Sequence, residues 1–167
     1  MAQFTGTSFK NYDDYMTPFY VWEDIDEYIP KDKVIWESFY GDGMSAEHLK
    51  KLGCKEVIHE KLDFFTSNKG EIVISNPPFS KKKEVLERLV ELDKPFILLM
   101  PSSTLNTQYC RKLFKDKEDK LKIIIPKKRI NFKKLVNGEI EKQKHNCNFD
   151  CFYYFWKIDL PDSIVWI

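Results

Sequence analysis

One short apolar run that stops at two prolines constrains the fold of this chain more than any other stretch. Residues 71–75 read Glu-Ile-Val-Ile-Ser, and Asn76-Pro77-Pro78-Phe79 follows directly. Three consecutive β-branched residues are typical of a strand that is covered on both faces. A proline cannot donate a backbone hydrogen bond, so two in succession end the ladder, and each preceding residue is held extended. The sequence therefore predicts a central strand that ends in a rigidly held amide, a free carbonyl and an aromatic ring.

Strand and helix patterns alternate along the rest of the chain. Apolar runs and helical spacing predict strands over 34–39, 56–60, 71–75, 95–101 and 121–126, and helices over 18–29, 45–52, 81–92 and 103–114. The chain then predicts a short strand over 129–132, a mobile basic loop over 133–148 and closing strands over 150–158 and 163–167. This order predicts a single α/β domain with a mainly parallel sheet and an antiparallel closing edge.

A second motif lies at the end of the first predicted strand. Gly41-Asp42-Gly43 connects that strand to a helix, as in the first unit of a nucleotide-binding βαβ fold. Strands one and four flank the point of strand-order reversal in doubly wound sheets, where ligands bind. If 34–39 is the first strand of that order and 71–75 the fourth, this turn and Asn76 open onto one crevice. A carboxylate between the glycines, with Glu37 upstream, disfavours a phosphate and favours a positively charged group.

The composition limits which class of protein this chain can belong to and in which compartment it is expected. The chain has 167 residues, 43% of them hydrophobic, and no apolar run of about 20 residues that would span a membrane. No basic segment precedes an apolar one at the N-terminus, which predicts an intracellular, cytoplasmic protein without membrane contact. The net charge of +1 hides an asymmetry, because 13 acidic and 7 basic residues lie in 1–63, whereas 13 basic and 5 acidic residues lie in 111–145. Such a split is typical of a cationic ligand at one end and a polyanion at the other.

The four cysteines, Cys54, Cys110, Cys147 and Cys151, have no framework spacing and are expected to be reduced thiols. Around His145 only two cysteines are near, which falls short of the four ligands of a structural zinc site. We therefore expect no metal.

These motifs resemble those of the S-adenosylmethionine-dependent N6-adenine methyltransferases, in particular the small phage and viral DNA-adenine enzymes. The likeness rests on Asn76-Pro77-Pro78-Phe79, on Tyr15-Met-Thr17-Pro18-Phe19 as the upstream cofactor element, on 37–43 as the glycine loop, and on Asp63-Phe64-Phe65. It implies a Rossmann-like class I methyltransferase fold and a protein encoded by a phage or virus. The sequence departs from the family at His59-Glu60-Lys61, where an acidic residue followed by an apolar one is usual.

The resemblance implies roles for individual residues. The catalytic group is Asn76, Pro77, Pro78 and Phe79. S-adenosylmethionine is expected to contact Tyr15, Thr17, Pro18, Glu37, Phe39, Gly41, Asp42, Gly43, Glu60, Asp63 and Phe64, with Glu60 placed for the ribose and Asp63 for the adenine.

The chemistry of these residue types agrees with amine methylation. The lone pair of an exocyclic adenine amine is delocalised into the ring, so an enzyme must favour its localised form. The Asn76 side-chain oxygen and the Pro77 carbonyl can accept the two amine hydrogens, while Phe79 stacks on the base. No charged general base is needed, and a target in duplex DNA has to be flipped out of the helix.

Basic residues supply the expected contacts to a nucleic-acid backbone. They are Lys81, Lys82, Lys83, Lys127, Lys128, Arg129, Lys133, Lys134, Lys142 and Lys144. No segment remains for a separate target-recognition domain, so we expect sequence choice to rest on loops, on a homodimer or on an accessory subunit.

Three functions fit the sequence. The first is DNA adenine-N6 methylation. The second keeps the chemistry and changes the substrate to RNA adenine or a protein glutamine amide, because the same acceptors fit any planar amine. The third is a catalytically silent partner subunit, which the altered segment at His59 keeps open.

Overall fold

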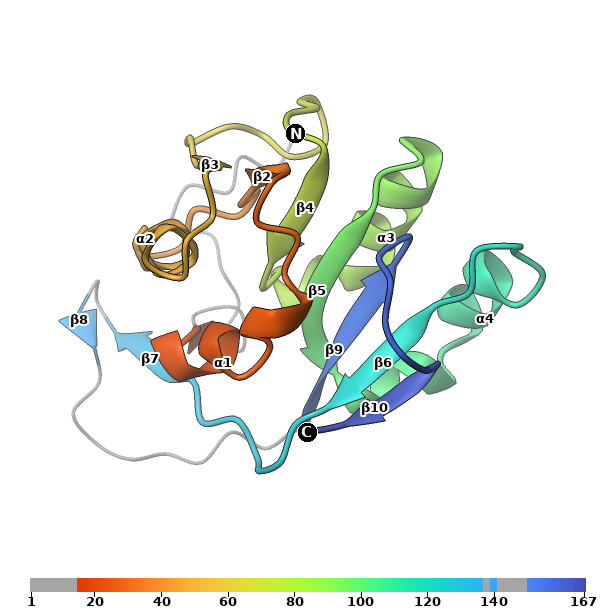
Figure 1. Ribbon diagram of the computed structural model, residues 1–167. Coiled ribbons are helices and arrows are strands. Elements are labelled where there is room, and N and C mark those ends of the chain that lie inside the picture. Colours follow the sequence, from red (N-terminus) through yellow and green to blue (C-terminus); the bar gives the residue numbers. More distant parts are fainter. Residues whose placement is uncertain (1–14, 137–138, 141–149) are drawn as a thin grey trace.

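A seven-stranded sheet forms the centre of the molecule in the computed structural model, which describes residues 15–136, 139–140 and 150–167 (Figure 1). The strands lie in the order β10, β6, β9, β5, β4, β2, β3. Their bounds are β2 Val34–Trp36, β3 Glu56–Ile58, β4 Ile72–Ser75, β5 Phe96–Pro101, β6 Lys122–Ile125, β9 Cys151–Trp156 and β10 Ile164–Trp166. Within this sheet, β9 alone runs antiparallel to its neighbours, β5 and β6. The predicted mainly parallel sheet with antiparallel pairing in its last part is confirmed.

Strand order reverses between β2 and β4. From β2 the chain passes through helix α2 (Met44–Lys51) to β3 at the edge and then returns to β4 on the other side of β2. β2 pairs in parallel with both β3 and β4, and Trp36 is opposite Val73. The predicted neighbourhood of the strands at 34–39 and 71–75 is therefore present, although β4 is the third strand of this sheet in chain order and not the fourth. The turns that follow β2 and β4 lie at the same edge of the sheet.

Alternating side chains build two cores on opposite faces of the sheet. Ile35, Ile72 and Ile74 face one core, which α1 (Phe19–Glu23), the 3-10 turn η1 (Asp26–Tyr28) and α2 cover. Trp36 and Val73 face the other, which α3 (Lys82–Glu91) and α4 (Gln108–Phe114) cover. Every residue of β4 and β5 is buried, because both strands lie inside the sheet with helices on each side. This three-layer arrangement explains why β4 is apolar up to Ser75.

A smaller sheet joins the start of the described chain to its basic part. Strand β1 (Tyr15–Met16) pairs antiparallel with β7 (Lys133–Val136), which pairs with β8 (Glu139–Ile140). The predicted loop over 133–148 is therefore wrong at β7 and β8, and residues 137–138 and 141–149 lie outside the described residues. The sequence Asn-Gly between the two strands is a strong hairpin signal, and the backbone pairing with β1 adds a third strand to the hairpin.

Three local predictions need correction. Residues 129–132 form no strand, and the strand begins only at Lys133. The first helix begins one residue later than predicted, at Phe19, and its N-cap is Pro18, with φ −65° and ψ 155°; Thr17, which the sequence makes a plausible N-cap, does not take that position. The predicted helix over 18–29 is interrupted after Glu23 and continues as the 3-10 turn η1. Likewise, 3-10 turns η2 (Phe79–Lys81) and η3 (Ser102–Asn106) precede α3 and α4.

Candidate active site

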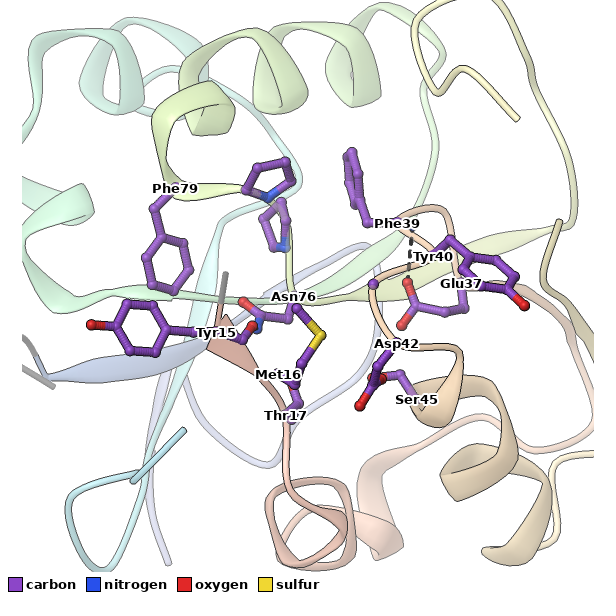
Figure 2. Close-up of a pocket in the computed structure, with 13 residues that line it drawn as sticks. Tyr15, Met16, Thr17, Glu37, Phe39, Tyr40, Asp42, Ser45, Asn76 and Phe79 are labelled. Carbon is purple, nitrogen blue, oxygen red and sulfur yellow. Dashed lines mark hydrogen bonds between the residues drawn. The ribbon is translucent and has the colours of Figure 1, made fainter. Parts of the chain in front are cut away.

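A pocket opens where β2 and β4 end, and it joins the motifs that the sequence singled out. Its walls come from three parts of the chain: the upstream segment at β1, the turn after β2 and the segment after β4 (Figure 2). The lining residues are Tyr15, Met16, Thr17, Glu37, Phe39, Tyr40, Gly41, Asp42, Ser45, Asn76, Pro77, Pro78 and Phe79. The convergence expected from the fold is thus present in the structure.

Asn76 holds its amide in a fixed direction at the end of β4. Its Nδ2 donates a hydrogen bond to the backbone carbonyl of Tyr15, at 3.3 Å. Its Oδ1 is buried and has no hydrogen-bond partner within the described residues. A buried polar atom without a partner is costly and is usually satisfied by a ligand or a water molecule. The Asn76 side chain therefore presents an acceptor, and only an acceptor, to the pocket.

Phe79 lies at the other end of the tetrapeptide and is 7% exposed. Pro78 directs the chain into η2, and the Phe79 ring meets Phe132 edge to face, with centroids 6.2 Å apart. Phe132 contacts the ring of Tyr15 in the same manner, also at 6.2 Å. Phe132 was not among the predicted site residues. It supports two pocket walls from behind, at the entry to β7.

The upstream segment contributes a second buried polar atom. Thr17 is 6% exposed and its hydroxyl lacks a hydrogen-bond partner within the described residues. Thr17 does not cap the first helix, so its hydroxyl is available to a ligand in the pocket. Met16 is a neighbour that the sequence analysis did not single out, although it lies between two predicted residues.

The turn after β2 takes its shape from its glycines. Gly41 has φ +56° and Gly43 has φ +84°, a region that other residues rarely adopt. A Cβ at Gly41 would lie 3.0 Å from the sulfur of Met16. The group that lies close to Gly41 is therefore a side chain of the protein itself. Between the glycines, Asp42 is exposed, and its Oδ1 accepts from the backbone N–H of Met44 at 3.0 Å. The turn therefore presents one fixed carboxylate to the pocket.

The sequence predicted a second negative charge at Glu37, but the structure buries this carboxyl group. It is 1% exposed and accepts hydrogen bonds from the Ser75 hydroxyl and from the backbone N–H of Phe39. Burial raises the pKa of Glu37 from 4.5 to about 8, against the opposing effect of these hydrogen bonds and with a smaller contribution from Asp42. Near neutral pH Glu37 is thus largely protonated in the free protein.

Tyr40 forms a wall that the sequence analysis missed. The imidazole of His59 stacks on its ring, with centroids 4.4 Å apart and an interplanar angle of 9°. Lys61 lies over the same ring, 4.9 Å from the centroid. Burial lowers the pKa of His59, which favours the neutral ring in this stack. The segment that departs from the methyltransferase pattern is therefore packed against a lining residue.

Five predicted cofactor contacts do not line this pocket. Glu60 is exposed beyond β3. The carboxylate of Asp63 accepts a hydrogen bond from the backbone N–H of Phe65 at 2.9 Å and so stabilises the turn to which Asp63 belongs. Phe64 is fully buried between Trp36 and Phe39, at centroid distances of 5.5 and 4.9 Å. The remaining two, Pro18 and Gly43, adjoin the pocket as helix N-caps.

Basic residues occupy two regions near the site. Lys81, Lys82 and Lys83 follow the tetrapeptide after Ser80, and no ion pair of theirs occurs within the described residues. Lys127 pairs with Asp24 at 3.5 Å and Arg129 with Asp150 at 3.2 Å.

The remaining lysines differ in how they are placed. Lys128 lies over the ring of Tyr20, 5.1 Å from its centroid. Lys133 and Lys134 belong to β7, whose backbone pairs with β1, the segment predicted to contact the cofactor. Lys142 and Lys144 lie outside the described residues.

Other binding chemistries find no support in the described part of the chain. Those residues contain no cluster of three or more His, Cys, Asp or Glu side chains that would hold a metal ion. None of the described helices has the length and apolarity that crossing a membrane requires. Cys54, Cys110 and Cys151 are buried thiols that form no disulfide with one another, whereas Cys147 is outside the described residues.

Comparisons with known proteins agree with the fold. No protein-family model and no curated protein matches the sequence. A Pyrococcus horikoshii protein provisionally assigned as an RNA methyltransferase has 15% identity and a TM-score of 0.53, over 92% of this chain and 94% of that one.

Two further solved structures match less well. A precorrin-6y C5,15-methyltransferase from Geobacter metallireducens has 12% identity and a TM-score of 0.47, over 89% of this chain and 97% of that one. A Listeria monocytogenes protein provisionally assigned as a class I S-adenosylmethionine-dependent methyltransferase has 14% identity and a TM-score of 0.49, over 96% and 68%. Neither of these two matches carries the fold assignment, which rests on the P. horikoshii structure and on the strand order: both agree with the predicted class I methyltransferase fold.

Proposed function

We propose that this protein transfers a methyl group from S-adenosylmethionine to the N6 amine of adenine in DNA. The observation that carries the proposal is the Asn76 side chain, whose Oδ1 is buried in the pocket without a partner among the described residues while its Nδ2 is held by Tyr15. An acceptor in that position suits the hydrogen of an amine and does not suit a carbonyl or a phosphate.

The pocket has features suited to a positively charged cofactor. Asp42 presents a carboxylate, Glu37 can become a second one, and the unpartnered Thr17 hydroxyl can bond a carboxyl group. S-adenosylmethionine carries a sulfonium and an ammonium group together with a carboxylate, so these residues fit its methionine end. The cofactor supplies an activated methyl group, and the protein supplies orientation and fixed dipoles.

Asn76 and Pro77 would hold the amine in its reactive form. The amide oxygen of Asn76 and the carbonyl of Pro77 accept the two amine hydrogens, which localises the nitrogen lone pair toward the cofactor side of the pocket. Phe79, buried against Phe132, offers its face to the adenine ring and fixes the plane of the base. With S-adenosylmethionine held by the residues above, the amine nitrogen would displace sulfur from the methyl carbon, and the amine proton would pass to solvent. A base in duplex DNA reaches this site only when flipped out.

Two substrates compete with DNA in this proposal. RNA adenine presents the same amine, and the P. horikoshii protein of similar fold is provisionally assigned to RNA. A glutamine amide fits the same pair of acceptors. DNA is favoured because of the resemblance to small DNA-adenine enzymes, and the lysines that follow Phe79 could bind the phosphates of either nucleic acid.

A product assay tests the function directly. The protein is incubated with methyl-labelled S-adenosylmethionine and with mixed-sequence duplex DNA, single-stranded DNA, RNA or protein extract, and the hydrolysed products are analysed by mass spectrometry. We expect N6-methyldeoxyadenosine from DNA. Label only in N6-methyladenosine or methylglutamine would move the function to RNA or protein. Tight cofactor binding without any labelled product would favour a silent partner subunit, and no cofactor binding would refute the methyltransferase proposal.

A further inference from the structure

Ser75 is the one polar side chain in the otherwise apolar strand β4. It is fully buried and is adjacent in sequence to Asn76. A buried hydroxyl without a partner is destabilising, so a serine here needs a bond that offsets its burial. That bond goes to Glu37, whose Oε1 accepts from the Ser75 hydroxyl across the boundary between β2 and β4.

The groups around Glu37 make its carboxyl sensitive to charge in the pocket. Ser75 approaches from β4, the Phe39 N–H from the same turn, and Ser45 from α2, and each lowers its pKa by bonding the ionised form. Asp42 from the glycine turn acts in the opposite direction, as does burial. Among the described residues that act on Glu37, none carries a positive charge. The cation that would favour its ionised form has to come from a ligand.

We propose that Ser75 is a positioning residue. Its hydroxyl orients and stabilises the ionised form of Glu37, so that binding of a positively charged cofactor drives a proton off Glu37. The inference rests on the proposed function in one respect, namely that the cation is S-adenosylmethionine. The balance is simple: protonated Glu37 plus the cation gives an ion pair of carboxylate and cation, and one proton leaves through the pocket to solvent. Ser75 links the cofactor side of the site to the strand that carries Asn76.

This arrangement predicts a pH dependence of cofactor affinity with a defined sign. Below the pKa of Glu37 the carboxyl is protonated in the free protein, so binding must displace a proton and is weakened. Affinity therefore rises with pH and levels off above about 8, where Glu37 is already ionised. Without the Ser75 hydroxyl the ionised form loses a hydrogen bond, and the rise moves to higher pH.

Two variants and a matched control test the role of Ser75. Ser75→Ala removes the bond to Glu37, and Glu37→Gln removes the titration. Ser38→Ala is the control, because Ser38 is also buried beside Glu37 in sequence, has no hydroxyl partner within the described residues and does not line the pocket. The titration of the Glu37 carboxyl is followed by carbon NMR in the cofactor-free proteins. Calorimetry from pH 6 to 9, in two buffers of different ionisation enthalpy, gives S-adenosylmethionine affinity and the protons released.

We expect Ser75→Ala to raise the midpoint of the Glu37 titration by about one pH unit. The pH at which the affinity for S-adenosylmethionine rises should move upward by a similar amount. Ser38→Ala should behave as the wild type, and Glu37→Gln should bind the cofactor with an affinity that is constant over this range and release no proton. An unchanged Glu37 titration in Ser75→Ala overturns the inference, even where cofactor binding is intact, and so does binding by the wild type without proton release below pH 8. If the wild type binds no S-adenosylmethionine, the proposed function fails, whereas the carboxyl titration still decides whether Ser75 controls Glu37.

Discussion

The side-chain Nδ2 of Asn76 lies 3.3 Å from the backbone oxygen of Tyr15, 61 positions earlier in the sequence, and donates a hydrogen bond to it. This bond orients the amide, because a carbonyl can only accept and therefore selects the nitrogen end. The opposite end, Oδ1, is left buried and unpartnered among the described residues. An acceptor held in this direction by the fold is a preorganised site for an amine hydrogen.

Replacement of this acceptor should stop the chemistry and spare cofactor binding. For Asn76→Ala we expect kcat to fall by at least about 100-fold, the order of loss seen when one preorganised polar group is removed from an active site. The dissociation constant of S-adenosylmethionine should change by less than about two-fold, since Thr17, Glu37 and Asp42 line other walls. Methyl-transfer kinetics and calorimetry measure the two quantities. A variant that turns over at the wild-type rate would refute the role of Asn76.

Asp42 should contribute to cofactor affinity through its charge. The substitution Asp42→Asn keeps an oxygen that can accept from the Met44 N–H, so the shape of the turn is preserved while the carboxylate is lost. We expect the dissociation constant of S-adenosylmethionine to rise about ten-fold, as one charge-assisted contact is worth on the order of 1.5 kcal/mol. Asp162→Asn is the control, because this exposed carboxylate precedes β10 and is absent from the pocket. Equal affinities of the two variants would remove the electrostatic argument.

Glu37 should make the free protein less stable as the pH rises. Its pKa of about 8 in the folded state exceeds the ordinary value of 4.5, so the folded protein keeps a proton that the unfolded chain has lost between these values. The free energy of unfolding therefore decreases from about pH 5 to about pH 8 because of this group, by a few kcal/mol in total. Thermal unfolding of Glu37→Gln should lack this part of the decrease. Parallel stability curves for the two proteins would show that Glu37 ionises freely in the fold.

Much of the site was predictable because its signals are local. The β-branched run and the two prolines predicted both β4 and the rigid presentation of Asn76, and the chain order predicted that β2 and β4 would be neighbours. These features depend on backbone geometry, which residue type constrains strongly. The same is true of the glycine turn, where two positive φ angles require glycine.

The direction of side chains and the proton affinity of Glu37 were harder to predict from the sequence. Nothing in Asp63-Phe64 tells which way the ring turns, and tertiary packing places Phe64 in the core between Trp36 and Phe39. Glu37 was interpreted as a charge, yet its burial by neighbouring strands makes it largely neutral near pH 7. The hairpin β7–β8 was missed because Lys-Lys-Leu-Val in β7 shows no apolar–polar alternation and β8 has two residues, which left only the Asn-Gly turn signal.

The lysines that follow the tetrapeptide should carry more of the nucleic-acid contact than those near residue 128. Lys127 and Arg129 already pair with Asp24 and Asp150, whereas Lys81–Lys83 form no ion pair within the described chain. An unpaired lysine gains more free energy when it binds a phosphate, because it does not have to give up an existing ion pair. These three lie at the edge of the sheet where the pocket opens.

Joint replacement of Lys81, Lys82 and Lys83 by glutamine should therefore weaken binding to single-stranded DNA and flatten its salt dependence. The slope of log K against log salt falls by about 0.7 for each phosphate that the protein no longer neutralises, or about 2 for all three. The matched control replaces Lys112, Lys115 and Lys117, which follow the first turn of α4, a helix that runs away from this edge. It changes net charge equally, so long-range attraction is the same in both variants. Fluorescence anisotropy at 50 to 200 mM salt separates the two effects, and identical slopes for the two triple variants would place the backbone contact elsewhere on the protein.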